Sequence, residues 1–163
     1  MNQTATLYAL KIKLTSPWLG NQSTRERVRR FRKDASGLIV VDLSQWSWTF
    51  KQAIEALHIS HVDPDTIRPQ TNIDPPTLVL YNRNFNDGKK NKSEMFEAMR
   101  ENLVLNVNIL VTTPPLSAKD GKTPPTIEEL LQIFKFSGSF LGLSPWGNSY
   151  GYGRFEVEQI KKL

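Results

Sequence analysis

The sequence has 163 residues, 39% of them hydrophobic and 23% charged, which is typical of one folded domain rather than a disordered or fibrous chain. Cysteine is absent, which excludes disulfides, thiolate metal sites and a cysteine nucleophile. No apolar run approaches the ~20 residues that a membrane span needs, and the N-terminus lacks the pattern of a secretory signal. We therefore expect a cytoplasmic protein without a membrane partner.

The net charge of +5 is concentrated near the start of the chain. Residues 1–33 hold eight bases and one acid, whereas the rest of the chain holds 13 bases and 15 acids. So many positive charges in one segment repel one another unless a polyanion neutralises them. We favour nucleic-acid binding over a solvated charged surface, because arginine, the main base here, binds phosphate and stacks on bases. The predicted contacts are Lys11, Lys13, Arg25, Arg27, Arg29, Arg30, Arg32 and Lys33.

The first third of the chain is predicted to form a strand, a basic segment, a second strand and a helix. Apolar and polar residues alternate over 6–15, which predicts a half-buried strand with Lys11 and Lys13 on its polar face. A capping-box spacing at 23–26 predicts a short helix, and we expect the basic segment 21–36 to be a mobile loop until a ligand binds. An apolar run at 38–41 predicts a central strand, and helical spacing over 46–57 predicts a helix packed on a sheet.

The later elements follow the same kinds of signal. The proline-rich stretch 60–76 predicts an irregular surface loop. The remaining predictions, in chain order, are a strand at 77–81, a hairpin tip at 82–93, a helical turn at 93–100, a strand at 104–111, a helix after the capping box of Thr126 and Glu129, and a strand at 155–160.

Two helices separated by pairs of strands indicate one α+β domain over residues 1–163. We predict a two-layer sandwich of the ferredoxin-like or RNA-recognition type, with a mostly antiparallel sheet and both helices on one face. The other face of such a sheet is open to a ligand.

Signals for catalysis are weak. His58 and His61 end the first long helix, where the helix dipole stabilises them, and this structural interpretation is favoured over a catalytic one. The sequence contains neither a phosphate-binding loop nor a framed serine nucleophile. We assign no metal and no cofactor, and we expect a protein that is not an enzyme.

The C-terminal part is rich in glycines and aromatic residues. The glycines allow close backbone approach to a ligand, and the aromatic rings offer flat faces to bases, although a tight turn packed into the core explains both equally well. The candidate residues here are Gly138, Gly142, Gly147, Gly151 and Gly153, with Trp146, Tyr150, Tyr152 and Arg154.

Three segments together resemble the RAMP superfamily, the ferredoxin-like RNA-binding subunits of CRISPR effector complexes. FSGSFLGLSPWGNSYGYGRFEVE at 136–158 is similar to the family's glycine-rich loop and closing strand. GLIVVDLSQWSWTFKQAIEAL at 37–57 resembles its strand, turn and helix, with Asp42-Leu43-Ser44-Gln45 in place of the usual Ser-Ser-Leu-Lys turn. TLYALKIKLTSPWLG at 6–20 stands where the family has its opening strand.

The resemblance implies that this chain binds RNA or single-stranded nucleic acid independent of sequence. The protein partners that it implies are further copies of this chain or other subunits of a larger ribonucleoprotein. The inserted thumb of backbone subunits would be small, reduced to 82–93. Two alternatives remain open. The first is a RAMP-type endoribonuclease that uses a histidine or Asp34, which lies after the first strand, and the second is a phage or mobile-element protein that joins or imitates a CRISPR complex through protein contacts.

Overall fold

The computed structural model describes residues 4–41, 43–70, 72–73, 77–86, 88–114, 121–143 and 151–163. Its strands are β1 (Ala5–Leu14), β2 (Trp18–Leu19), β3 (Val28–Arg29), β4 (Ile39–Val40), β5 (Ile67–Pro69), β6 (Asn72–Ile73), β7 (Val79–Asn86), β8 (Asn91–Met99), β9 (Val104–Thr112) and β10 (Phe155–Lys162). Its helices are α1 (Leu43–Leu57), the 3-10 turn η1 (Pro64–Thr66), α2 (Ile127–Phe136) and the π turn η2 (Ser137–Leu141).

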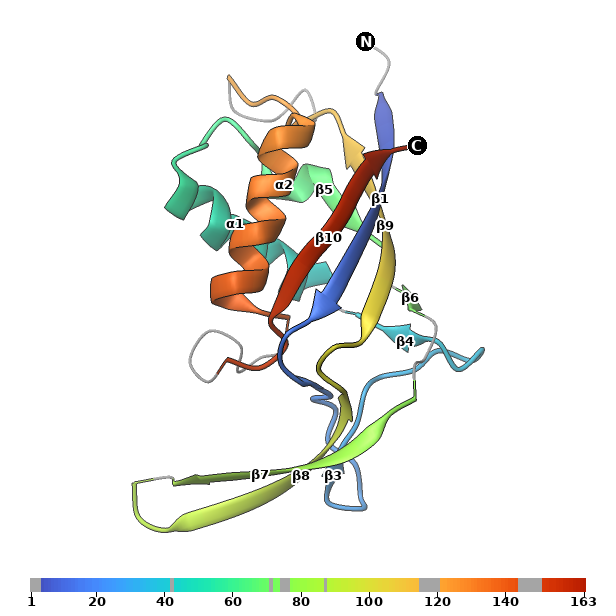
Figure 1. Ribbon diagram of the computed structural model, residues 1–163, viewed down its shortest axis with the longest axis vertical. Coiled ribbons are helices and arrows are strands. Elements are labelled where there is room, and N and C mark those ends of the chain that lie inside the picture. Colours follow the sequence, from blue (N-terminus) through green and yellow to red (C-terminus); the bar gives the residue numbers. More distant parts are fainter. Residues whose placement is uncertain are drawn as a thin grey trace.

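The main sheet has the strand order β10-β1-β9-β5, and every neighbouring pair is antiparallel. Along the chain its elements follow as β1, α1, β5, β9, α2 and β10. Two β-α-β units whose strands interleave in this way give the ferredoxin-like topology. Both helices lie on one face of the sheet (Figure 1), so the predicted α+β fold class is confirmed.

The core lies between this sheet and the helices. Alternate residues of β1 and β9 are buried there, including Leu10, Ile12 and Ile109. On the helix side, the ring of Phe50 lies 5.4 Å from that of Trp46 and 5.1 Å from that of Phe134, which joins α1 to α2. Burial of these large apolar side chains fixes the helices on the sheet.

Helix α2 begins at the capping box expected from the sequence. The Thr126 hydroxyl accepts a hydrogen bond from the amide of Glu129, and the Glu129 carboxylate accepts one from the amide of Thr126. These bonds satisfy two helix-end groups that would otherwise lack partners. In the part of the chain that the structure describes, no helix has the length and apolar composition needed to cross a membrane.

A second sheet is built on a long hairpin. Strands β7 and β8 pair over their whole length, from Val79 opposite Ala98 to Asn86 opposite Asn91. The other edge of β8 pairs with β2 and β3 near its C-terminal end. The hairpin projects from one end of the two-layer body (Figure 1), and residues 82–93 make up its far part.

The predicted helix after Ser23 is wrong. The backbone groups of Gln22 and Arg30 bond to each other at 2.8 and 2.9 Å, and β3 pairs with β8, so this segment doubles back as extended chain. The carboxylate of Glu26 binds the Arg30 guanidinium at 2.8 Å rather than capping a helix. Pairing with a distant strand has outweighed the local capping signal.

Three further predictions need correction. The run 38–41 is not a central strand, because β4 has two residues, pairs with the two-residue strand β6 and lies outside the main sheet. The region 60–76 is more ordered than a loop, since it contains β5, an edge strand of the main sheet that tolerates its proline. The helical turn expected at 93–100 is strand β8, because pairing with β7 and burial of Phe96 decide its conformation.

Candidate nucleic-acid interface

The basic segment is attached to the base of the hairpin. Val28 pairs with Met95 and Arg29 with Phe96 in the parallel contact of β3 with β8. Gly20, just after β2, donates its amide to the carbonyl of Glu97 at 2.8 Å. A Cβ at Gly20 would lie only 2.4 Å from backbone atoms of residues 30 and 31, so the close approach of these two stretches requires glycine here.

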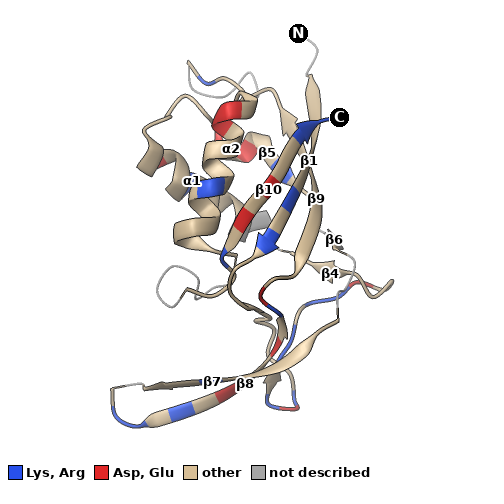
Figure 2. Cartoon of the chain, in the orientation of Figure 1, with Lys and Arg blue, Asp and Glu red and all other residues tan. Residues whose placement is uncertain are grey.

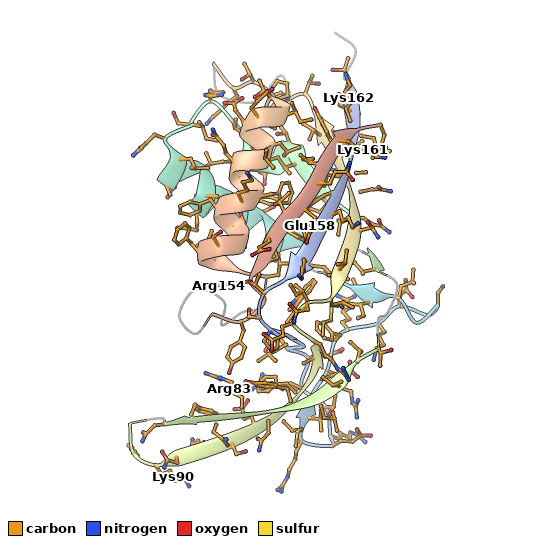
Figure 3. The ribbon with its side chains drawn as sticks, in the orientation of Figure 1. Arg83, Lys90, Arg154, Glu158, Lys161 and Lys162 are labelled. Atoms are coloured by element: carbon orange, nitrogen blue, oxygen red, sulfur yellow. The ribbon has the colours of Figure 1, made fainter. Side chains whose placement is uncertain are left out.

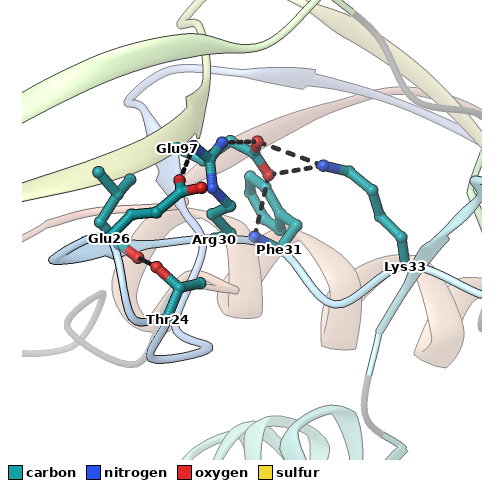
Figure 4. Close-up of polar contacts among 7 residues, drawn as sticks. Thr24, Glu26, Arg30, Phe31, Lys33 and Glu97 are labelled. Carbon is teal, nitrogen blue, oxygen red and sulfur yellow. Dashed lines mark hydrogen bonds and ion pairs between the residues drawn. The ribbon is translucent and has the colours of Figure 1, made fainter.

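Glu97 on β8 forms ion pairs with Arg30 and Lys33, two of the residues predicted to contact phosphate. Its carboxylate lies 3.0 Å from the Arg30 guanidinium and 3.0 Å from the Lys33 ammonium, and it accepts the amide of Phe31 at 3.1 Å (Figure 4). Its side chain is only 8% exposed. Burial alone would raise the pKa of Glu97, but the bonds from Lys33, the Phe31 amide and Arg30 together hold it below its ordinary value. Glu97 is therefore an ionised anchor for the basic segment.

The six bases of the segment divide into two sets. Arg29 is paired with Glu94 at 3.1 Å, and Arg30 and Lys33 are paired as described above. The remaining three, Arg25, Arg27 and Arg32, are exposed, and their side chains make no hydrogen bond or ion pair with any residue the structure describes. The first set fixes the segment, and the second is available to an anionic ligand. Figure 2 shows bases along this stretch of chain, beside the hairpin.

The C-terminal glycine-rich part contacts the same hairpin. The ring of Tyr152 lies 5.8 Å from that of Tyr81 on β7, with their hydroxyls 3.4 Å apart. Arg83, whose guanidinium lies 6.0 Å from the centre of the Tyr152 ring, belongs to the same cluster. Burial raises the pKa of the Tyr152 hydroxyl, and its bond to Tyr81 adds to that shift. Tyr152 is thus a packing residue as well as a candidate base contact.

Arg154 and the neighbouring glycines are held by the chain that follows β1. The Arg154 amide donates to Ser16 Oγ at 2.9 Å, and the Gly153 amide donates to the carbonyl of Pro17 at 2.7 Å. Gly142, Gly151 and Gly153 have positive φ angles of 75°, 77° and 70°, which favour glycine. Trp146, Gly147 and Tyr150 lie outside the described residues.

Gly138 has a packing role. A Cβ there would lie 2.2 Å from the carbonyl oxygen of Phe155 and 2.7 Å from its ring. We expect Gly138→Ala to destabilise the fold by about 1–3 kcal/mol, because the backbone of β10 would have to move. The neighbouring exposed Ser139→Ala is the control and should change stability by less than about 0.5 kcal/mol in chemical denaturation. Equal stability of the two variants would contradict this role.

The open face of the main sheet carries Lys11 and Lys13. Lys11 lies between Gln159 and Asn106, and Lys13 lies opposite Glu156 on β10. Arg68 on β5 and Lys161 on β10 are exposed and occupy the same face by strand alternation. The exposed apolar residues Leu7, Val104 and Leu110 share this face, so its bases offer a second, partly apolar surface to an anion.

The three weak catalytic candidates have structural contacts. The Nε2 atom of His61 contacts the carboxylate of Glu129, which belongs to the capping box of α2. Asp34 accepts the amides of Ser36 and Leu38 at 2.8 and 3.0 Å, which closes its own turn. His58 has a φ of 57° just after α1, a conformation common at helix ends. Among the described residues, no group of three or more acidic or histidine side chains could hold a metal ion.

The sequence predictions omitted the hairpin residues. Glu94 and Glu97 give no signal as partners of the basic segment, because they lie 64 to 67 positions away along the chain. Lys89, Lys90 and Lys92 are exposed near the hairpin tip, where Figure 3 labels Lys90. Their KKNK run is visible in the sequence, but acids elsewhere in residues 34–163 offset its positive charge when the charges of that whole range are summed.

Comparison with known proteins identifies a fold and no family. No family model matches the chain, and no curated protein matches it. Among solved structures, it is similar to a chain of the Type III-B Cmr-beta complex bound to cognate target RNA, with a TM-score of 0.60 and 13% identity. The match covers 98% of this chain and 61% of the other, so this chain spans about three fifths of that neighbour's length. The protein is thus similar in fold to a chain of a Cmr complex.

Proposed function

We propose that this protein binds RNA or single-stranded nucleic acid through the phosphate backbone, largely independent of sequence, as a non-enzymatic subunit of a cytoplasmic ribonucleoprotein assembly. The observation that carries this proposal is the arrangement of the basic segment. Glu97 and Glu94 fix its position on the hairpin, and Arg25, Arg27 and Arg32 remain exposed without a described partner. Guanidinium groups carried on a backbone fixed in this way suit phosphate better than a flexible charged tail does, because less backbone freedom is lost on binding.

Two observations support an assembly rather than an isolated binder. The neighbour of similar fold is part of a complex bound to RNA. The hairpin projects beyond the two-layer body with lysines near its tip, so it can reach a ligand or a second copy outside the footprint of the body (Figure 1). We propose that several copies bind side by side along one strand.

Fluorescence anisotropy with labelled RNA, single-stranded DNA and duplex DNA tests the binding proposal. The three exposed arginines alone predict that log K falls with log salt at a slope of about −2 or steeper, using ~0.7 per phosphate contact. The number of bound copies, measured by native mass spectrometry, is expected to rise with RNA length. Absence of binding to all three ligands at low salt would refute the proposal.

The same samples distinguish a nuclease from a binding protein. Labelled RNA is expected to remain intact over hours, with and without divalent metal ions. Cleavage by the wild type that Asp34→Asn or His61→Gln abolishes would favour the endoribonuclease alternative. Binding to a protein partner that survives nuclease treatment, without affinity for nucleic acid, would favour the protein-contact alternative.

A further inference from the structure

The far part of the hairpin contains a depression of about 500 Å³. This volume lies within the range of ~300–1,000 Å³ that is usual for small-ligand sites. The lining residues come from both strands and are Asn84, Phe85, Asn86, Asn91, Lys92 and Ser93. The four neutral hydrogen-bonding residues form two cross-strand pairs on one face of the hairpin, whereas Phe85 and Lys92 form the pair between them and project from the other face.

Not all of these polar groups are available to a ligand. Asn86 is used by the turn, because its carboxamide oxygen accepts the amide of Gly88 at 2.7 Å and its nitrogen donates to Asn91 at 3.1 Å. The Ser93 hydroxyl donates to Asn82, one pair further down the hairpin. Asn84, in contrast, is exposed and has no hydrogen-bond partner among the described residues, and Asn91 uses only its oxygen. The carboxamide of Asn84 and the Nδ2 of Asn91 therefore remain for a ligand.

The composition of these strands is unusual for an exposed hairpin. Asparagine is disfavoured in strands, yet Asn82, Asn84, Asn86 and Asn91 all share one face of the hairpin. Residues that oppose the local structure are expected where a function requires them. Asn82 and Asn86 have local contacts that explain their presence, whereas no contact within the described chain explains Asn84.

We propose that this depression binds one ribonucleotide unit of a bound strand and distinguishes RNA from DNA. A carboxamide both donates and accepts hydrogen bonds, as the ribose 2′-hydroxyl does, so Asn84 and Asn91 are suited to that group. The ring of Phe85, whose centre lies 4.7 Å from the Arg83 guanidinium, projects from the other face of the hairpin and is not part of this contact.

This inference rests on the proposed function and adds a ligand preference that the exposed arginines do not supply. Phosphate contacts do not distinguish RNA from DNA, because both carry the same phosphates, whereas a hydrogen bond to the 2′-hydroxyl forms only with RNA. We expect the wild type to bind RNA about fivefold more tightly than DNA of the same sequence, the effect of one net hydrogen bond. RNA with 2′-O-methyl groups should fall between the two, because it keeps an acceptor and loses the donor.

The test uses Asn84→Ala, with Asn82→Ala as a matched control. Asn82 is exposed on the same face, two residues along the same strand, and does not line the depression. Asn84→Ala should lower RNA affinity about fivefold, leave DNA affinity within twofold and leave the salt slope unchanged. Asn82→Ala should preserve the RNA preference. Asn84→Thr introduces a residue that is favoured in strands, so it should lose as much RNA affinity as Asn84→Ala if the loss does not come from a misfolded hairpin.

Two results would overturn the inference while leaving the proposed function intact. One is equal affinity of the wild type for RNA and DNA, and the other is an equal loss of both affinities in Asn84→Ala. Absence of binding to either nucleic acid would instead refute the proposed function itself.

Discussion

Replacing Arg25, Arg27 and Arg32 together with glutamine is expected to weaken RNA binding by at least about tenfold at low salt. Each arginine removed should take ~0.7 from the slope of log K against log salt, so the slope should become shallower by about 2. The melting temperature should stay nearly unchanged, because the three side chains have no partner among the described residues. Anisotropy across a salt series and a thermal melt of the same preparation measure both effects.

The control for this variant removes the same charge elsewhere. Lys51 on α1, Lys135 on α2 and Lys162 on β10 are exposed and lie away from the basic segment. Their joint replacement with glutamine should change the slope by much less than the arginine variant does. If both triple variants weaken binding equally, net charge rather than this surface governs the affinity.

Removing the carboxylate of Glu97 is expected to destabilise the fold more than removing the more exposed carboxylate of Glu94. Glu97→Ala leaves the Phe31 amide without its acceptor and separates Arg30 and Lys33 from their shared partner. Loss of a buried carboxylate with bonds of this kind costs about 2–3 kcal/mol. The full penalty of a wholly buried pair is not expected, since both cations are about a third exposed and can reach water. Chemical denaturation measures the difference.

Two comparisons make this prediction specific. Glu94→Gln breaks a single, more exposed contact with Arg29 and should cost less than about 1 kcal/mol. Glu97→Gln keeps an acceptor for the Phe31 amide and should fall between Glu94→Gln and Glu97→Ala. Equal stability of all three variants would show that the Glu97 contacts do not hold the basic segment.

The pH dependence of Glu97 follows from the direction of its pKa. Since its folded-state pKa is below the ordinary value of 4.5, the unfolded chain binds the proton more tightly than the folded chain does. The stabilisation is therefore fully present above pH 4.5 and is lost as the pH falls through the lower folded-state pKa. The stability difference between wild type and Glu97→Gln should shrink over that acidic range, and a constant difference would contradict the assignment.

The sequence was sufficient for the elements whose signal is local. Strands β1 and β9 alternate clearly, and the Thr126 capping box and helical spacing gave α2 and α1. Their order, together with the closing strand β10, was enough for the fold class. The pairing of β8 with β2 and β3 in the second sheet was missed because it is not local. Nothing near Glu97 or Val28 in the sequence indicates that β8 and β3 meet.

The sequence predicted where the candidate interface lies, but not which of its bases are paired with acids and which are exposed. A count of charges gives all six bases of the segment the same weight. Only the folded chain shows that Arg29, Arg30 and Lys33 meet acids from β8, while Arg25, Arg27 and Arg32 do not meet any described acid. Neutralising Arg29 or Arg30 would therefore disturb structure as well as charge.

The length of the hairpin has a consequence for what one copy can cover. At ~3.3 Å per residue, the seven steps from Val79 to Asn86 extend about 23 Å from the root that Glu97 and Tyr152 secure. Because the far strands pair mainly with each other, pairs of residues can be added or removed there without altering the core. For the proposed arrangement of copies side by side along one strand, changes in the length of the hairpin should therefore alter the spacing between neighbouring copies without changing the contacts that each copy makes with the strand.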